Sequence, residues 1–175
     1  MISKIDYSNA LVPNCTDELV IQACEEALQY GFAAVAVFPS CVKMVAKRLE
    51  GSRVHSQIAV GFPMGNHLTQ TKLTEARLAL EDGAREVDMV MNLHRFFSKD
   101  YSYVQDELCQ MVELAAGYDV KVKLIIETGY LTDEQKMIAG KIAVDAGAGF
   151  IKTCTGFGPG RATVHDIGLL VEFWG

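Results

Sequence analysis

Lys152 is the residue whose type and position most directly suggest chemistry. It stands in a short apolar run, Phe150-Ile151-Lys152-Thr153, whose composition predicts a strand. Burial disfavours the charged form of a lysine, and the neutral amine is a nucleophile that attacks carbonyl groups. A lysine that reaches solvent from the end of a strand fits the same position equally well. The pattern alone therefore leaves both interpretations open.

Asp88 is the second candidate and lies within another apolar segment, residues 86–92. Strand alternation places Asp88, Val90 and Asn92 on one face, which points inward if the strands form a barrel. A carboxylate beside an amine can relay protons while an imine forms. The alternative is a structural aspartate that pairs with a neighbouring strand.

Lys123 and Asp6 are candidates for supporting roles. Lys123 shares a strand face with Ile125 and Glu127. It is either a second interior cation that repels the charge on Lys152 or an ion-pair partner for Asp88. Asp6 is a weaker case of the same kind, at the end of the first predicted strand.

A glycine-rich turn follows the strand of Lys152 and contains Thr155, Gly156, Phe157 and Gly158. Exposed backbone N–H groups in such a turn can hold a phosphate group. Turn glycines are common, and the sequence matches neither the Walker A motif nor the dinucleotide fingerprint. The turn at residues 61–65 also follows a predicted strand, and we expect it to shape the rim of the pocket.

Other kinds of site find little support. The histidines have no partner at the spacing of a metal site, so we expect no bound metal. The sequence also lacks the Gly-x-Ser-x-Gly turn of serine hydrolases.

Short apolar runs alternate with longer helical patterns along the chain. We expect strands at residues 4–6, 33–38, 56–61, 86–92, 120–127 and 149–153, and helices at 17–30, 41–49, 69–82, 102–116, 133–146 and 164–173. This alternation predicts α/β architecture with a parallel sheet, in a single domain that covers residues 1–175. Periodicity allows a doubly wound sheet or most of a TIM (β/α)8-type barrel. Polar residues at the carboxyl ends of the strands favour the barrel, because barrel enzymes place their chemistry there.

Charge and composition limit the partners. The net charge of −6 argues against nucleic acid but allows a small phosphorylated substrate at a local anion site. No apolar run approaches the roughly 18 residues of a membrane span, and the first residues lack the apolar core of a signal peptide. The five scattered cysteines suit free thiols in a reducing compartment. We therefore expect a cytoplasmic protein that contacts neither membranes nor nucleic acids.

Five segments carry a specific pattern in order along the chain: Ile5-Asp6-Tyr7-Ser8, Gly61-Phe62-Pro63-Met64-Gly65, the segment 86–92, Ile125-Ile126-Glu127-Thr128, and the segment 150–158 with Ala162-Thr163. Together they resemble the deoxyribose-phosphate aldolases, a family of class I, Schiff-base-forming aldolases. The lysine followed by Thr-x-Thr-Gly-Phe-Gly is the most specific part of the match.

The resemblance implies a (β/α)8 barrel that needs no metal or other cofactor. It implies reversible cleavage of 2-deoxy-D-ribose 5-phosphate to acetaldehyde and D-glyceraldehyde 3-phosphate, so the partners are a small phosphorylated sugar and aldehydes. Carried over residue by residue, Lys152 matches the Schiff-base lysine and Asp88 the aspartate that transfers protons with water. Asp6 and Lys123 match polar active-site residues with supporting roles.

The main departure from the family is at the end of the sequence. Gly175 falls where the sixth predicted helix finishes, so we expect about six βα units, without the second lysine and most of the phosphate-binding loops that the family has in strands seven and eight. Unpaired strand edges favour association, and we expect a homo-oligomer.

Three alternatives to an active aldolase of this type follow from the sequence. One is a catalytically impaired barrel that acts only as a fragment or oligomerising module, and another is a metal-dependent aldolase or other barrel lyase. The third, a Rossmann-type binder, is disfavoured because the first strand is not followed by Gly-x-Gly-x-x-Gly.

Overall fold

The computed structural model describes residues 2–172 and contains one sheet of six parallel strands. The strands pair in chain order, each with the next. Because a doubly wound sheet reverses its strand order near the middle, the sequential order decides for the barrel type. Every strand overlaps a predicted one: β1 (Asp6–Tyr7), β2 (Ala34–Val37), β3 (His55–Val60), β4 (Glu86–Val90), β5 (Lys121–Ile125) and β6 (Phe150–Lys152).

Six α-helices lie where the sequence predicts them, with ends that differ by at most two residues. They are α1 (Asp17–Tyr30), α2 (Val42–Arg48), α3 (Thr69–Glu81), α5 (Tyr101–Ala116), α6 (Asp133–Asp145) and α7 (Val164–Val171). The last residue of the predicted helix 164–173 lies outside the described residues. A short helix, α4 (Leu93–Phe97), and three 3-10 turns, η1 (Ile2–Lys4), η2 (Pro39–Cys41) and η3 (Thr128–Tyr130), were not predicted.

β4 and β5 each end two residues before their predicted ends, so Asn92 and Glu127 lie outside the sheet. β4 ends at Val90, and Asn92 caps α4 by accepting a hydrogen bond from the Arg95 amide (3.1 Å). β5 ends at Ile125, and Glu127 adopts left-handed backbone angles, with φ +55°. The prediction that both residues line the inward face of a strand is therefore wrong.

Local interactions at the helix ends explain where the helices begin and end. The Thr16 side chain accepts a hydrogen bond from the Leu19 amide at the start of α1. Thr132 and Gln135 form a reciprocal capping box at the start of α6. Gly31 ends α1 in the left-handed region, at φ +69°, a conformation that glycine adopts without steric cost.

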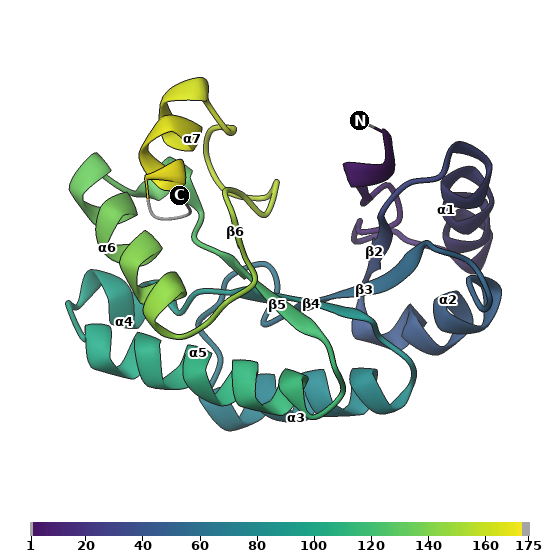
Figure 1. Ribbon diagram of the computed structural model, residues 1–175, viewed down its shortest axis with the longest axis horizontal. Helices are drawn as coiled ribbons and strands as arrows, with labels where there is room; N and C mark the ends of the chain where they lie inside the picture. Colours follow the sequence, from purple (N-terminus) through teal and green to yellow (C-terminus); the bar gives the residue numbers. More distant parts are fainter. Residues whose placement is uncertain (1, 173–175) are drawn as a thin grey trace.

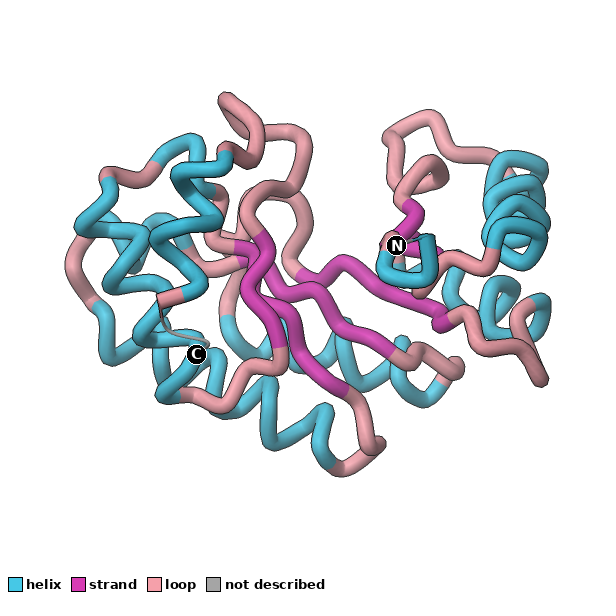
Figure 2. The backbone as a smooth tube through the Cα atoms, turned by 45° about the horizontal axis from the view of Figure 1, so that its top comes forward, coloured by secondary structure: helices cyan, strands magenta, loops and turns pink. Residues whose placement is uncertain are grey.

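The sheet is curled, and the helices cover its convex side (Figures 1 and 2). Alternate strand residues turn outward and join one hydrophobic core with the helices, among them Val35, Val37, Ile58, Val60, Val87, Met89, Val122 and Leu124. The residues between them turn to the concave side, and many of them are small or polar, among them Ala36, Gln57, Ala59, Asp88, Lys123 and Lys152. The fold thus separates a packed apolar layer from a polar inner face.

The sheet is open between its two edge strands. β1 and β6 do not pair with each other, so the six strands form an incomplete TIM-type barrel. None of the helices between residues 2 and 172 has both the length and the apolar character of a membrane span.

Candidate active site

Lys152 and Asp88 meet on the concave face of the sheet. Lys152 Nζ lies 2.5 Å from Asp88 Oδ2. The lysine stands at the end of β6 and the aspartate on β4, with Ile125 of the intervening β5 in register with Lys152. The Asp88 side chain is 2% exposed and that of Lys152 is 30% exposed. The pair therefore combines a buried carboxylate with an amine that small molecules can reach.

Gln57 holds Asp88 from the other side. Its Nε2 donates to Asp88 Oδ1 at 2.6 Å and to Asp6 Oδ2 at 3.0 Å. Burial raises the pKa of the Asp88 carboxyl, while its hydrogen-bond partners and the nearby ammonium groups act to lower it. Because a carboxylate with a raised pKa is a stronger base, Asp88 is suited to take a proton from a neighbouring amine or water.

Lys123 pairs with Asp6 and Glu86, and Nζ lies 2.5 Å from an oxygen of each. The alternative prediction of an ion pair with Asp88 is wrong, because these two carboxylates are its partners. Burial acts to lower the pKa of Lys123, but the hydrogen bonds and charges of its partners prevail and raise it. Lys123 is therefore an interior cation whose charge is compensated, which weakens the repulsion that it exerts on Lys152.

A cavity of about 290 Å³ opens beside the lysine–aspartate pair. Ala36 and Ala59 contribute small side chains to its wall, which leaves room for a ligand next to Asp88. Arg161 contributes to the same wall. The other lining residues include Ser8, Phe62, Ile125 and Cys154.

The turn after β6 folds around the carboxylate of Glu127. Thr155 donates both its N–H (3.0 Å) and its hydroxyl to this carboxylate, and the Phe157 N–H donates to the Thr155 hydroxyl (3.0 Å). A side chain at Gly158 would come within 2.7 Å of Glu127, so glycine permits the close approach. Thr155 and Gly156 line the cavity. The N–H groups of Thr155 and Phe157 are thus used within the protein and are not free to hold a phosphate. Phosphate binding at this turn stays a prediction.

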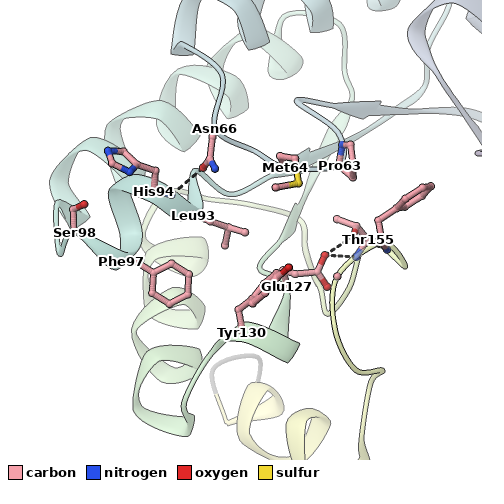
Figure 3. A pocket seen from close by; sticks show the side chains of 12 residues that line it. Pro63, Met64, Asn66, Leu93, His94, Phe97, Ser98, Glu127, Tyr130 and Thr155 are labelled. Carbon is pink, nitrogen blue, oxygen red and sulfur yellow. Dashed lines mark hydrogen bonds between the residues drawn. The ribbon is translucent and has the colours of Figure 1, made fainter. Parts of the chain in front are cut away.

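A second hollow, of about 430 Å³, borders the same turn (Figure 3). Exposed apolar side chains, Met64, Phe97, Tyr130 and Phe157, contribute to its lining, and Glu127 points from its wall toward Thr155. This hollow is the larger of the two but contains no lysine, so we place the chemistry in the smaller cavity. The turn 61–65 contributes residues to both spaces, which confirms that it shapes the rim.

Comparison with known proteins decides the family. The model of the DeoC/LacD family aldolases matches residues 2–167. The chain belongs to this family. The membership inferred from the motifs is thereby confirmed, and so is its class, that of an aldolase.

Several relatives in the family are deoxyribose-phosphate aldolases. The enzyme of Thermococcus kodakarensis is 46% identical over 168 residues, which cover 95% of this chain and 75% of the relative. That of Caldanaerobacter subterraneus is 43% identical over 170 residues, or 97% of this chain and 74% of the relative. A structure of the Aeropyrum pernix enzyme, a tetramer, matches with a TM-score of 0.90 at 30% identity, over 98% of this chain and 71% of that one.

Three polar residues of the site were not singled out from the sequence: Gln57, Glu86 and Arg161. Gln57 stands in an apolar strand at an inward position, so strand alternation carried a signal that could have found it. Glu86 lies two residues before Asp88 and on the same face. Arg161 follows a glycine-rich turn with no periodic pattern, and only the folded loop brings it to the cavity.

Proposed function

We propose that this member of the DeoC/LacD family is a deoxyribose-phosphate aldolase that works through a Schiff base on Lys152. It cleaves 2-deoxy-D-ribose 5-phosphate reversibly into acetaldehyde and D-glyceraldehyde 3-phosphate. The observation that carries the proposal is the 2.5 Å contact between Lys152 Nζ and the buried Asp88 carboxylate at the wall of a cavity. The alternative of a barrel without catalysis does not explain why a reachable amine is held against a base.

The reaction begins when the neutral Lys152 amine attacks the open-chain substrate carbonyl, and loss of water gives a protonated imine. The imine draws electrons from the neighbouring C–C bond. That bond breaks, glyceraldehyde 3-phosphate leaves, and an enamine stays on the lysine. The enamine then takes a proton on carbon, and water hydrolyses the resulting imine to acetaldehyde and free Lys152.

Asp88 moves the protons in this cycle. Its Oδ2 is close enough to accept the ammonium proton before attack and to return a proton when water leaves. With a water molecule, it takes the proton of the hydroxyl group beside the breaking bond and later supplies one to the enamine carbon. Asp6 and Lys123 act in support by keeping the charges behind Asp88 paired.

The substrate phosphate needs a cation or free amides near the cavity. The amide of Gly156, on the Thr155–Gly158 turn, and the guanidinium of Arg161 both belong to residues of the cavity wall. We assign the phosphate to this side of the cavity, since arginine binds phosphate oxygens in a bidentate manner. Glu127 does not bind the phosphate, because a carboxylate repels it, and its carboxylate already accepts hydrogen bonds from Thr155.

The cysteines and the open sheet edges bear on the cellular location and the assembly of the enzyme. All five cysteines are free thiols, which suits a reducing cytoplasm and a role in deoxyribonucleotide catabolism. A relative of this fold is tetrameric, and the open edges of the sheet favour association, so we assign the chain to a homo-oligomer.

Borohydride trapping tests the covalent step. Reduction in the presence of acetaldehyde converts an imine into a stable ethylamine, and peptide mass mapping should locate this adduct on Lys152. A wild-type protein that cleaves deoxyribose 5-phosphate without any adduct at Lys152 would contradict the proposal, and so would a folded protein without turnover.

The role of Asp88 has a matched control. Asp88→Asn should lower turnover by roughly 10²–10⁴-fold, the usual contribution of an acid–base group. Asp145→Asn removes a carboxylate that pairs with Lys141 on the surface, and it should leave turnover unchanged.

A further inference from the structure

Gln57 occupies a position that the reaction as described does not use. It is fully buried, and it is not among the residues that line the cavity. A substrate therefore does not touch it. Yet a single nitrogen of this side chain joins two carboxylates, at 2.6 Å for Asp88 and 3.0 Å for Asp6.

The surrounding side chains make this bridge possible. Asp6 is on β1 and Gln57 is on β3, so the contact between them spans β2. On β2 the two inward residues are Ala34 and Ala36, both small and both buried. Because methyl groups leave space on this part of the inner face, Gln57 can reach toward both neighbouring carboxylates.

The orientation of the amide follows from its partners. Both neighbours accept hydrogen bonds, so the NH₂ group must face them, and the oxygen is turned away. Within the described residues, Gln57 Oε1 has no hydrogen-bond partner. An unsatisfied buried acceptor lowers stability. The amide therefore hydrogen-bonds both carboxylates while its own oxygen is left without a partner.

We infer that Gln57 is a positioning residue: its amide holds the Asp88 carboxylate against Lys152 and couples this pair to the Asp6–Lys123 pair. The inference rests on the proposed function for its catalytic meaning. One oxygen of Asp88 is fixed by Gln57, which leaves the other, Oδ2, directed at the Lys152 amine.

The charged groups that face Asp88 set the expected pH dependence. Lys152 from β6 and Lys123 from β5 act directly on its charge. Asp6 of β1 lies beyond Gln57, Glu86 of β4 pairs with Lys123, and Arg161 lines the cavity. The hydrogen bond from Gln57 lowers the pKa of Asp88 against the effect of burial. Its removal therefore raises that pKa and moves the acidic limb of the pH–rate profile to higher pH.

The first variant removes the donor. Gln57→Leu should lower kcat by about tenfold to a hundredfold, the usual effect of losing a hydrogen bond to a charged group, and should leave KM nearly unchanged because Gln57 does not line the cavity. The matched control is Gln22→Leu, which removes an exposed glutamine that also donates to a carboxylate, that of Glu26 (2.8 Å). The control should change neither constant.

The second variant, Gln57→Glu, keeps the shape of the side chain and tests the inference even if Gln57→Leu does not fold. Gln57→Glu places a third carboxyl group beside Asp6 and Asp88. Near neutral pH its charge repels both, and kcat should fall further than in Gln57→Leu. As the pH falls and the new carboxyl takes a proton, it can donate again, so activity relative to wild type should recover. Gln57→Leu should show the opposite trend.

A measurement without turnover separates this inference from the proposed function. Carbon-13 NMR of the carboxyl groups follows the titration of Asp88 in the free protein, in wild type and each variant. A raised Asp88 pKa in Gln57→Leu, with none in Gln22→Leu, supports the bridge even if borohydride leaves Lys152 unmodified. An unchanged Asp88 pKa, or an unchanged kcat in a folded and otherwise active Gln57→Leu, overturns it.

Discussion

Lys72 and Lys152 are both held against a carboxylate, but on opposite sides of the sheet. Lys72, on α3, lies behind the convex face with its Nζ 2.7 Å from Glu107 Oε2 of α5 and 2.9 Å from the Val90 carbonyl. Its side chain has no exposed surface. Lys152 makes one such contact, with Asp88, and its side chain is 30% exposed beside a cavity.

The comparison shows that a perturbed basicity does not by itself identify a reactive lysine. Burial lowers the pKa of Lys72, and the nearby carboxylate charges only partly oppose this. That lysine is nevertheless enclosed, because the turn at Gly61 covers it so closely that a side chain there would come within 2.8 Å of Lys72 Cε. No carbonyl compound can approach it. Access from a cavity, rather than depth of burial or a neighbouring carboxylate, distinguishes Lys152.

Replacing each lysine by methionine gives the largest contrast in activity. Lys152→Met should lower turnover by roughly 10³-fold or more, because the covalent route is lost, and should abolish the borohydride adduct. Lys72→Met should keep the adduct on Lys152 wherever the protein remains folded. An adduct that vanishes in folded Lys72→Met but persists in Lys152→Met would reverse the assignment.

Lys72, which should matter little for activity, should matter strongly for stability. Lys72→Met leaves the Glu107 carboxylate buried without its cation, and unfolding in urea should show a loss of about 3–5 kcal/mol. The double variant Lys72→Met/Glu107→Leu should recover most of this loss, because no charge then stays buried. Lys141→Met, at an exposed pair with Asp145, is the control and should change stability by less than about 1 kcal/mol. Equal losses in the single and double variants would show that packing, rather than charge, sets the effect.

Much of the framework could be predicted from local patterns. The alternation of apolar runs with helical patterns predicts the order of the elements, and alternation within β4 places Asp88 on the inner face. The motif around Lys152 identified the amine. These features depend on residues close in sequence, or on a family pattern, and so they can be recognised in one chain.

The remaining features depend on contacts between distant segments. The partners of Lys123 are Asp6, 117 residues away, and Glu86, and no local pattern distinguishes them from Asp88. Gln57 is one polar residue in an apolar strand, and its partners come from other strands, Asp6 from β1 and Asp88 from β4. Lys72 looks like a surface residue of an amphipathic helix, since the enclosing α5 and the turn at Gly61 come from other parts of the chain.

Replacing a third lysine, Lys136, should have the smallest effect, and it adds a third ion pair to the comparison of Lys72 and Lys152. Lys136 of α6 pairs with Asp166 of α7 (2.8 Å) and Asp133 (3.0 Å), and it is not among the residues that line the catalytic cavity. The hydrogen bond from Lys136 is the main cause that holds the pKa of Asp166 below its usual range. A carboxyl group with a lowered folded-state pKa stabilises the protein above its unfolded pKa, and this contribution disappears as the pH falls through the folded value.

Lys136→Met should therefore lower the free energy of unfolding by about 1 kcal/mol at pH 7, a small value because the Asp166 carboxylate keeps its two hydrogen bonds from Thr163. Urea unfolding of wild type and Lys136→Met at pH 7 and at pH 3 measures it, and the difference between the two proteins should shrink at the lower pH. A difference that stays constant would assign the effect to packing of the lysine stem. In the wild type, acetaldehyde and borohydride should leave Lys136 unmodified under conditions that label Lys152. Lys136 does not line the catalytic cavity, and its hydrogen bonds to Asp166 and Asp133 raise its pKa, which leaves less of the neutral amine.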